Sequence, residues 1–245
     1  MINIDSVYQK VLALTNKEQR GYITPQEFNL LANQAQMEIF EQYFYDMEQL
    51  KRRSNDNYEY SSLDTLHEKI SVFEVLNTNI SLTASSNGHN VVTAGLFNFY
   101  KFGSISIKYG SNKLQQAERI TVKQSRLYEK SYLTAGSTTR PYYFLQDDPS
   151  GSIIRFLPEP STTDSVTINY IRAPKSVSWG YVIVANRPLF DPNPIKTQNF
   201  EIHLSDEVEL VYKILKLAGV AIQRNDISQA GQVFETSQIQ QEKLQ

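Results

Sequence analysis

The pattern of apolar and polar positions is clearest between residues 21 and 44, which read GYITPQEFNLLANQAQMEIFEQYF. Thr24 is suited to cap a helix, Pro25 fits the first helical position, and Glu27 completes a capping box. The apolar residues that follow recur at intervals of three and four, which is the spacing of a helix face. The sequence therefore predicts a helix that begins at Pro25.

This helix carries two apolar stripes with only narrow polar strips between them. The first stripe is Phe28, Leu31, Ala32, Ala35 and Ile39, the second is Leu30, Met37, Phe40 and Phe44, and the polar strips hold Asn33, Gln34, Gln36 and Gln42. Either the helix is central and buried within its own domain, or it packs inward on that domain and outward on a neighbouring subunit. The second interpretation makes Leu30, Met37, Phe40, Phe44 and Tyr45 the candidate subunit interface.

Helical patterns also mark both ends of the chain. A short helix capped by Asn3 or Asp5 is expected to end near Gly21. Ser205 is expected to cap a helix in SDEVELVYKILKLAGVAI, and residues 225–245 carry apolar positions at helical spacing. The polar stretch from Ser54 to Glu68 is expected to form a loop.

Between Ile70 and about Val184 the pattern changes to short runs of β-branched and aromatic residues separated by turn signals such as NG and DDPSGS. This spacing is typical of an antiparallel sandwich or a small barrel. The segment from Thr121 to Leu133 fits a short helix better than a strand. Residues 186–199, NRPLFDPNPIKTQN, contain three prolines and are expected to form the connection back to the helices.

The order of helices, strands and helices predicts an α+β fold with two domains. Residues 1–66 together with 200–245 are expected to form a helical domain from both termini, because each end needs the other to bury its apolar stripe. Residues 67–199 are expected to form an inserted β-rich domain, built as an antiparallel β-sandwich or a barrel-like sheet.

Composition narrows the class of protein. The chain has 245 residues, a net charge of −2 and no cysteine, which excludes disulfides and thiolate metal sites. Near-neutral charge argues against a protein that coats nucleic acid through its phosphates. No apolar run is long enough to span a bilayer and the first residues lack a signal-peptide pattern, so we expect no membrane association. The chain is rich in aromatic residues, with 15 tyrosines and 12 phenylalanines. Tyrosine is enriched in protein interfaces, so this composition is typical of a protein that binds other subunits.

No catalytic constellation is recognisable. His67, His89 and His203 lack the spacing of a zinc site, and the glycines form neither a P-loop nor a dinucleotide fingerprint. Asp147 and Asp148 lie in a turn signal, as does Asp191 in FDPNP. We therefore expect no catalytic residue, no cofactor and no metal. A hydrolase whose carboxylates pair only in space is the third hypothesis for the function.

Three segments carry a resemblance to a known family: NKEQRGYITPQEFNLLANQAQMEIFEQYF, then RPYYF with IIRFLPEP and VTINYIRAP, and last FEIHLSDEVELVYKILKLAGVAI. In these segments the chain resembles neck and tail ring proteins of crAss-like phages and, more distantly, the head-to-tail adaptor (tail tubular A) class of podoviruses. The resemblance implies a non-enzymatic virion protein, assembled in the cytoplasm of the bacterial host. Its partners would be eleven further copies in a ring of twelve, the portal protein, neighbouring tail rings, and phage DNA that passes without sequence-specific binding.

Two expectations concern particular surfaces. The C-terminal residues Gln238, Ile239, Gln240, Gln241 and Leu244 either extend to a neighbouring ring as a docking tail or form a frayed terminus. The alternative function is a carbohydrate- or receptor-binding tail protein that uses exposed aromatic side chains of the β domain. The tyrosines of YFYD and YYF are candidates for a sugar-stacking platform, although tyrosines in such patterns are more often core or interface.

Overall fold

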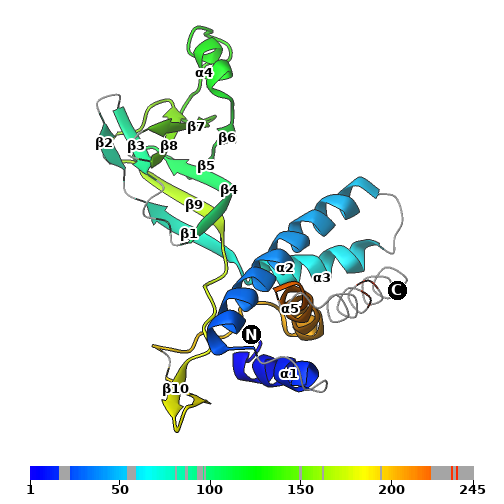
Figure 1. Ribbon diagram of the computed structural model, residues 1–245. Helices are drawn as coiled ribbons and strands as arrows, with labels where there is room; N and C mark the ends of the chain where they lie inside the picture. The colour runs from blue at the N-terminus through cyan, green and yellow to red at the C-terminus, as the bar shows by residue number, and fades with distance from the viewer. Residues whose placement is uncertain are drawn as a thin grey trace. The chain divides into compact units, whose positions relative to one another are not determined.

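The computed structural model describes the chain in two compact units (Figure 1). The residues described are 1–16, 23–53, 59–80, 82–85, 88–92, 96, 98–148, 151–161, 163–193, 195–221, 233 and 236. The first unit consists of Met1–Val72 with Pro174–Gln245, and the second consists of Phe73–Ala173. The prediction of a fold that combines helices with antiparallel sheets is confirmed, and the described strands do not close into a barrel. The predicted β-rich domain, 67–199, is longer than the second unit.

The first unit is mainly helical. Its helices are α1 (Ile4–Asn16), α2 (Pro25–Arg53), α3 (Glu59–Ser71), the 3₁₀ turn η2 (Leu204–Asp206) and α5 (Glu207–Ala221). The predicted start of α2 is confirmed: the Thr24 N–H donates to Glu27 Oε2 at 2.9 Å, and the Glu27 N–H donates to Thr24 Oγ1 at 3.3 Å. The Thr24 N–H lowers the pKa of Glu27, because it stabilises the carboxylate.

Two local predictions in this unit were wrong. The expected loop from Ser54 to Glu68 is helical from Glu59 onward, because Leu63, Leu66 and Ile70 recur at helical spacing and turn one face inward. The expected cap Ser205 lies inside η2 instead. The ring of His203 caps that turn, since its Nδ1 accepts from the Ser205 N–H at 3.3 Å.

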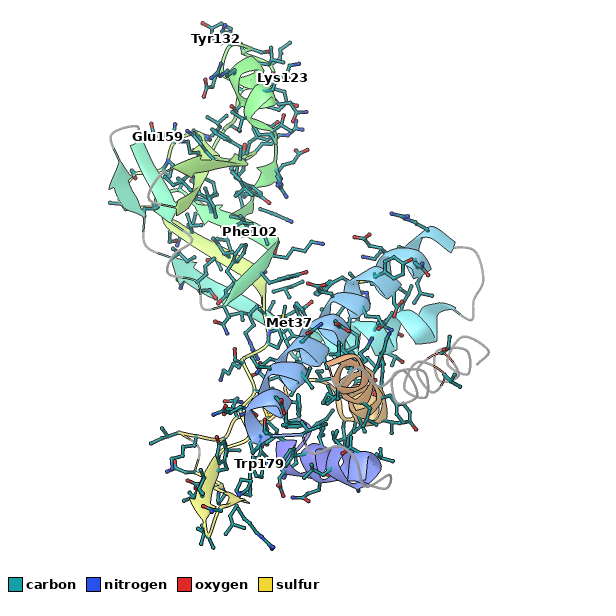
Figure 2. The ribbon with its side chains drawn as sticks, viewed as in Figure 1. Met37, Phe102, Lys123, Tyr132, Glu159 and Trp179 are labelled. Carbon is teal, nitrogen blue, oxygen red and sulfur yellow. The ribbon has the colours of Figure 1, made fainter. Side chains whose placement is uncertain are left out.

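The core of the first unit lies between α2 and the helices that pack on it, which are α3 and α5. Its largest fully buried side chains are Phe28, Phe40, Phe200, Ile2, Ile4, Ile23 and Ile39. Met37, labelled in Figure 2, lies near the middle of α2 and is half-buried. The first apolar stripe of α2 faces the core, since four of its five residues are fully buried and Leu31 is half-buried.

The second unit contains two sheets. The four-stranded sheet has the order β1 (Glu74–Ile80), β9 (Ser165–Arg172), β4 (Phe99–Lys108), β5 (Gln115–Gln116). The five-stranded sheet has the order β2 (Thr83–Ser85), β3 (Gly88–Val92), β8 (Gly151–Leu157), β7 (Tyr142–Asp148), β6 (Glu118–Arg119). Every pairing is antiparallel except that of β6 with β7.

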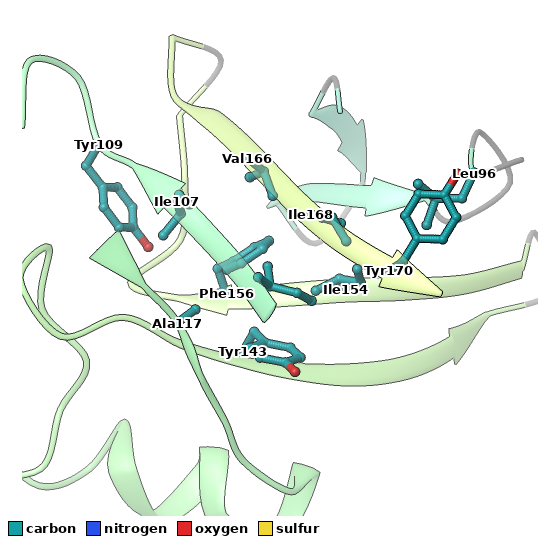
Figure 3. Close-up of a cluster of buried hydrophobic side chains, with 11 residues drawn as sticks. Leu96, Ile107, Tyr109, Ala117, Tyr143, Ile154, Phe156, Val166, Ile168 and Tyr170 are labelled. Atoms are coloured by element: carbon teal, nitrogen blue, oxygen red, sulfur yellow. The ribbon is translucent and has the colours of Figure 1, made fainter. Parts of the chain in front are cut away.

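Side chains from both sheets form one hydrophobic cluster (Figure 3). In β9, Val166, Ile168 and Tyr170 are buried while the residues between them are more exposed, which is the period of two that a half-buried strand requires. Ile154 and Phe156 of β8 reach the same cluster from the other sheet. One face of β9 therefore contributes to the core of the second unit.

A carboxylate holds one end of this unit. The Gly110 N–H donates to Asp164 Oδ1 and the Ser161 N–H donates to Asp164 Oδ2, each at 2.7 Å. Burial opposes ionisation of Asp164, but these N–H groups outweigh it and lower the pKa of the carboxyl. The bond from Gly110 ties the loop before β9 to the end of β4, and the bond from Ser161 closes the loop itself.

A short helix and a β-hairpin are the remaining elements that the structure describes. The expected short helix is confirmed as α4 (Val122–Tyr128), whose cap Thr121 forms a capping box with Gln124. The expected connection 186–199 contains a strand, because β10 (Tyr181–Val184) and β11 (Arg187–Phe190) form an antiparallel hairpin in the first unit. Ala185 and Asn186 at its turn have φ of 50° and 60°, the left-handed values that a two-residue hairpin turn needs.

Candidate interaction surfaces

The polar strip of α2 binds an extended segment of the same chain, residues 174–180, which we call the strap. The Val177 N–H donates to Asn33 Oδ1 at 2.8 Å, and Asn33 Nδ2 donates to the Val177 carbonyl at 2.9 Å. Asn29 repeats the arrangement, with the Trp179 N–H at 2.7 Å and the Trp179 carbonyl at 3.4 Å. Each Asn side chain thus accepts from the N–H and donates to the carbonyl of one strap residue, which is how a neighbouring β-strand would pair with that residue.

The spacing of helix and strap explains why this pairing fits. Residues four apart on a helix are separated by about 6 Å along its axis, and residues two apart in an extended chain by about 6.6 Å. Asn29 and Asn33 therefore meet alternate residues of the strap. Gln36 continues the series, because its Nε2 donates to the Lys175 carbonyl at 2.8 Å and its Oε1 accepts from the Glu201 N–H at 3.2 Å.

The buried side chain of Trp179 anchors the strap to the first unit. Its side chain is buried, its Nε1 donates to Asp5 Oδ1 of α1 at 2.9 Å, and its ring lies 4.3 Å from that of Tyr8. On the other side the ring stacks on Tyr181 at 5.8 Å and contacts Phe190 at 5.9 Å. The same side chain therefore anchors the base of the β10–β11 hairpin to α1 and α2.

The second apolar stripe of α2 is mostly core. Phe40 is fully buried and Phe44 is 8% exposed, and their rings meet edge to face at 5.0 Å. The prediction that these two residues face a neighbouring subunit is corrected by this burial, because α3 and α5 both cover α2. Of the predicted interface, Leu30 at 73% and Tyr45 at 60% are exposed, and Met37 is half-buried.

A buried charge cluster fastens α2, α3 and η2 together. Lys69 Nζ lies 2.8 Å from Asp206 Oδ1, and the Tyr43 hydroxyl donates to the other oxygen of the same carboxylate. Burial, and then the negative charge of Asp206, raise the pKa of the Tyr43 phenol far above its usual range. Ser205 Oγ donates a further bond at 2.9 Å. Both oxygens of the Asp206 carboxylate therefore have hydrogen-bond partners within the first unit, which gives Asp206 a structural role.

The β10–β11 hairpin exposes apolar side chains to water. The exposed fractions are 45% for Val182, 67% for Ile183, 52% for Val184 and 53% for Leu189. Among the strands that the structure describes, none pairs with the outer edge of β10 or of β11. A two-stranded sheet with apolar side chains and open edges is a surface that proteins normally cover.

The residues considered for chemistry are not brought together. His67 is exposed on α3, His203 caps η2, and Asp191 closes its own turn by accepting from the Asn193 N–H at 3.1 Å. The ammonium of Lys196, at 2.9 Å, is the main reason that the pKa of Asp191 is lowered. Within the described ranges no group of three or more acidic or histidine side chains could hold a metal ion, and no helix is long and apolar enough to cross a membrane.

Three further expectations concern the β unit and the C-terminus. Asp147 and Asp148 are the last residues of β7, opposite Ser152 and Gly151 of β8. The segment YYF is buried and therefore offers no sugar-stacking platform, and of YFYD only Tyr45 is well exposed. The docking-tail residues Gln238, Ile239, Gln240, Gln241 and Leu244 lie outside the described residues.

Sequence reasoning missed the strap and the hairpin. The amides at positions 29, 33 and 36 follow one helix face, and that spacing was the available signal for the strap. In comparisons with known proteins, no protein-family model matches the chain and no curated protein matches it significantly.

Proposed function

We propose that the chain is a structural subunit of a tailed-bacteriophage virion that forms the head-to-tail connector ring below the portal. The helical unit, made from both termini, would form the body of a ring of about twelve copies around the genome-exit channel. The β unit would be an inserted sandwich on its periphery, and the C-terminal residues would reach a neighbouring ring. The chain has no catalytic role in this proposal.

The observation that carries the proposal is the exposed apolar hairpin. Leaving apolar surface in water costs about 25 cal/mol for each Å², so a fixed patch of this kind indicates a partner. Trp179 holds the hairpin rigidly, which lowers the entropy that would be lost on docking. Leu30 and Tyr45 add exposed apolar area on the same unit. The sequence resemblance to phage ring proteins suggests the portal, neighbouring rings and further copies as the partners.

Imaging of the chain mixed with its portal protein tests this function. The wild type should add a ring to the portal in negative-stain images. Ile183→Asp should abolish that ring, because it places a charge on the covered hairpin, whereas Leu76→Asp at a 62% exposed site of the other unit should not. Fluorescence of Trp179 would show that both variants are folded. Rings formed equally well by Ile183→Asp, or a wild type that never joins the portal, would contradict the proposal.

The alternative of a carbohydrate- or receptor-binding protein has less support. Tyr109, Tyr142, Tyr143 and Tyr170 of the second unit are buried, whereas Tyr100 and Tyr132 are exposed among the residues that the structure describes there. Binding of the full-length chain to members of a broad glycan panel would favour the alternative over the connector.

A further inference from the structure

The end of the second unit that carries α4 is a basic surface. We call residues 118–140 the tip. The tip contains five cationic and two anionic residues and has a net charge of +3, whereas the first unit contains 14 cationic and 19 anionic residues and has a net charge of −5. Lys123, Arg126 and Lys130 are all exposed. The charge of the chain is therefore divided between a basic tip and an acidic helical unit.

The tip has a fixed conformation. The Thr121 capping box sets the start of α4, and the ring of Tyr128 lies 5.1 Å from that of Tyr142 in β7. Gly136 lies so close to β8 that an added Cβ would be 2.4 Å from the carbonyl oxygen of Leu157. The loop after α4 is consequently held against the sheet by its own packing.

The tip exposes large apolar side chains among its cations. Tyr132 is 104% exposed, Leu133 is 97% exposed and Leu127 is 62% exposed. Figure 2 shows Tyr132 and Lys123 at the outer end of the second unit, pointing away from it. An ordered loop that combines Tyr, Leu and Arg in this way has the composition of a protein-binding surface. Nucleic-acid phosphates would match the cations but would leave the apolar side chains without a partner.

The chain itself offers a matching acidic surface on α2. Gln34, Glu38, Glu41, Tyr45 and Glu48 recur at intervals of three and four and so follow one face of the helix, which we call the acidic stripe. Glu41, Tyr45 and Glu48 are exposed. The Glu48 carboxylate forms a long ion pair with Arg52, at 3.9 Å between exposed side chains. The stripe thus presents carboxylates around an exposed aromatic ring.

We propose that the tip of one copy docks on the acidic stripe of a second copy. The contact joins two different surfaces, so repetition builds a head-to-tail series of copies, which closes into a ring when the rotation between neighbours divides a full turn. This inference rests on the proposed function as a ring subunit, and it names the surfaces that neighbouring copies share. Opposite charges supply attraction and register, and Tyr132 and Leu133 supply the apolar contact.

Charge reversal in two variants tests the contact directly. Lys123→Glu with Arg126→Glu makes the tip acidic, and Glu41→Lys with Glu48→Lys makes the stripe basic. In sedimentation at low ionic strength the wild type should self-associate, and added salt should weaken the association. Each variant alone should lose association at least about tenfold, because like charges then meet. An equal mixture of the two variants should recover it, since each tip then finds an opposite stripe on the other variant.

The controls separate contact from folding. Lys108→Glu with Lys113→Glu reverses two exposed cations of the same unit outside the tip and should associate as the wild type does. Trp179 fluorescence and far-ultraviolet circular dichroism should be unchanged in all variants. A mixture that fails to associate, or variants that associate normally when alone, would overturn the proposal. Tip variants that lose binding to duplex DNA but keep self-association would assign the tip to nucleic acid instead.

The absence of native cysteine allows a second test. Tyr132→Cys on one copy and Tyr45→Cys on another should cross-link with a short bifunctional maleimide much faster than Tyr132→Cys with Leu76→Cys. Equal cross-linking rates for the two pairs would contradict the proposed contact between the tip and the acidic stripe. Rings on the portal without this cross-link would refute the tip contact alone, whereas the cross-link without portal-bound rings would refute only the proposed place of the chain in the virion.

Discussion

Replacing Asn33 by alanine should loosen the strap without disturbing the rest of α2. The side chain of Asn33 is the partner of both backbone groups of Val177, at 2.8 and 2.9 Å. Alanine favours the helix but offers neither a donor nor an acceptor. The change therefore tests whether an amide side chain holds the extended segment in place.

The magnitude follows from the groups left without a partner. A buried donor or acceptor that loses its hydrogen bond costs about 1–3 kcal/mol, and the lower part of that range applies because these groups are only partly buried. The N–H and the carbonyl of Val177 together then cost about 2.5 kcal/mol. The higher helix propensity of alanine returns about 0.5 kcal/mol. We expect Asn33→Ala to lower the free energy of unfolding by about 2 kcal/mol.

The single tryptophan provides a selective assay. Because Trp179 lies in the strap, its fluorescence reports strap release during urea denaturation, while far-ultraviolet circular dichroism reports the helices. Gln34→Ala is the matched control on the same helix, since Gln34 is exposed and bonds only to Glu38, at 3.0 Å. The control should stay within about 0.5 kcal/mol of the wild type.

Either of two results would contradict the proposed role of Asn33 in holding the strap. Asn33→Ala and Gln34→Ala could show the same free energy of unfolding, which would mean that the strap needs no amide partner. Alternatively, Asn33→Ala could lose stability with no change in the environment of Trp179, which would place the defect elsewhere than in the strap.

Three further predictions concern the two cores and the dependence on pH. Asp206→Asn leaves the half-buried Lys69 without its counter-charge and should lower the free energy of unfolding by about 3 kcal/mol. Calorimetry should show partial recovery when Lys69→Met is added, and no recovery would contradict the pairing. Phe40→Asp should unfold the first unit, because it places a charge in the core. Leu30→Asp should keep the free energy of unfolding within about 0.5 kcal/mol of the wild type, as denaturation followed by circular dichroism would show. Equal stability of the two variants would contradict the burial of Phe40. Because the pKa of Asp164 is lowered in the fold, its stabilisation is complete above about pH 4 and is lost as the pH falls through the folded-state pKa. Denaturant titrations should therefore show the difference between the wild type and Asp164→Asn shrinking from about pH 6 to about pH 2, and a constant difference would be the contrary result.

The correct sequence predictions depended on interactions between near neighbours. The start of α2 at Pro25 was predicted because a capping box joins residues three apart. The strand-rich middle of the chain was predicted because short runs of β-branched and aromatic residues alternate there with turn signals. The helix from Glu59 was missed, since a run of polar residues at its start hid three apolar residues at helical spacing.

By itself, the sequence determined that α2 is a long helix with two apolar stripes and amides between them, because local spacing sets both features. Only the tertiary structure decided what each face touches. Phe40 and Phe44 became core because α3 and α5 pack on α2, and Asn29 and Asn33 became partners of the strap because a segment about 145 residues later in the chain returns to them. Burial depends on which distant segments meet, and the free energy of that meeting is summed over contacts that no local pattern of residues encodes.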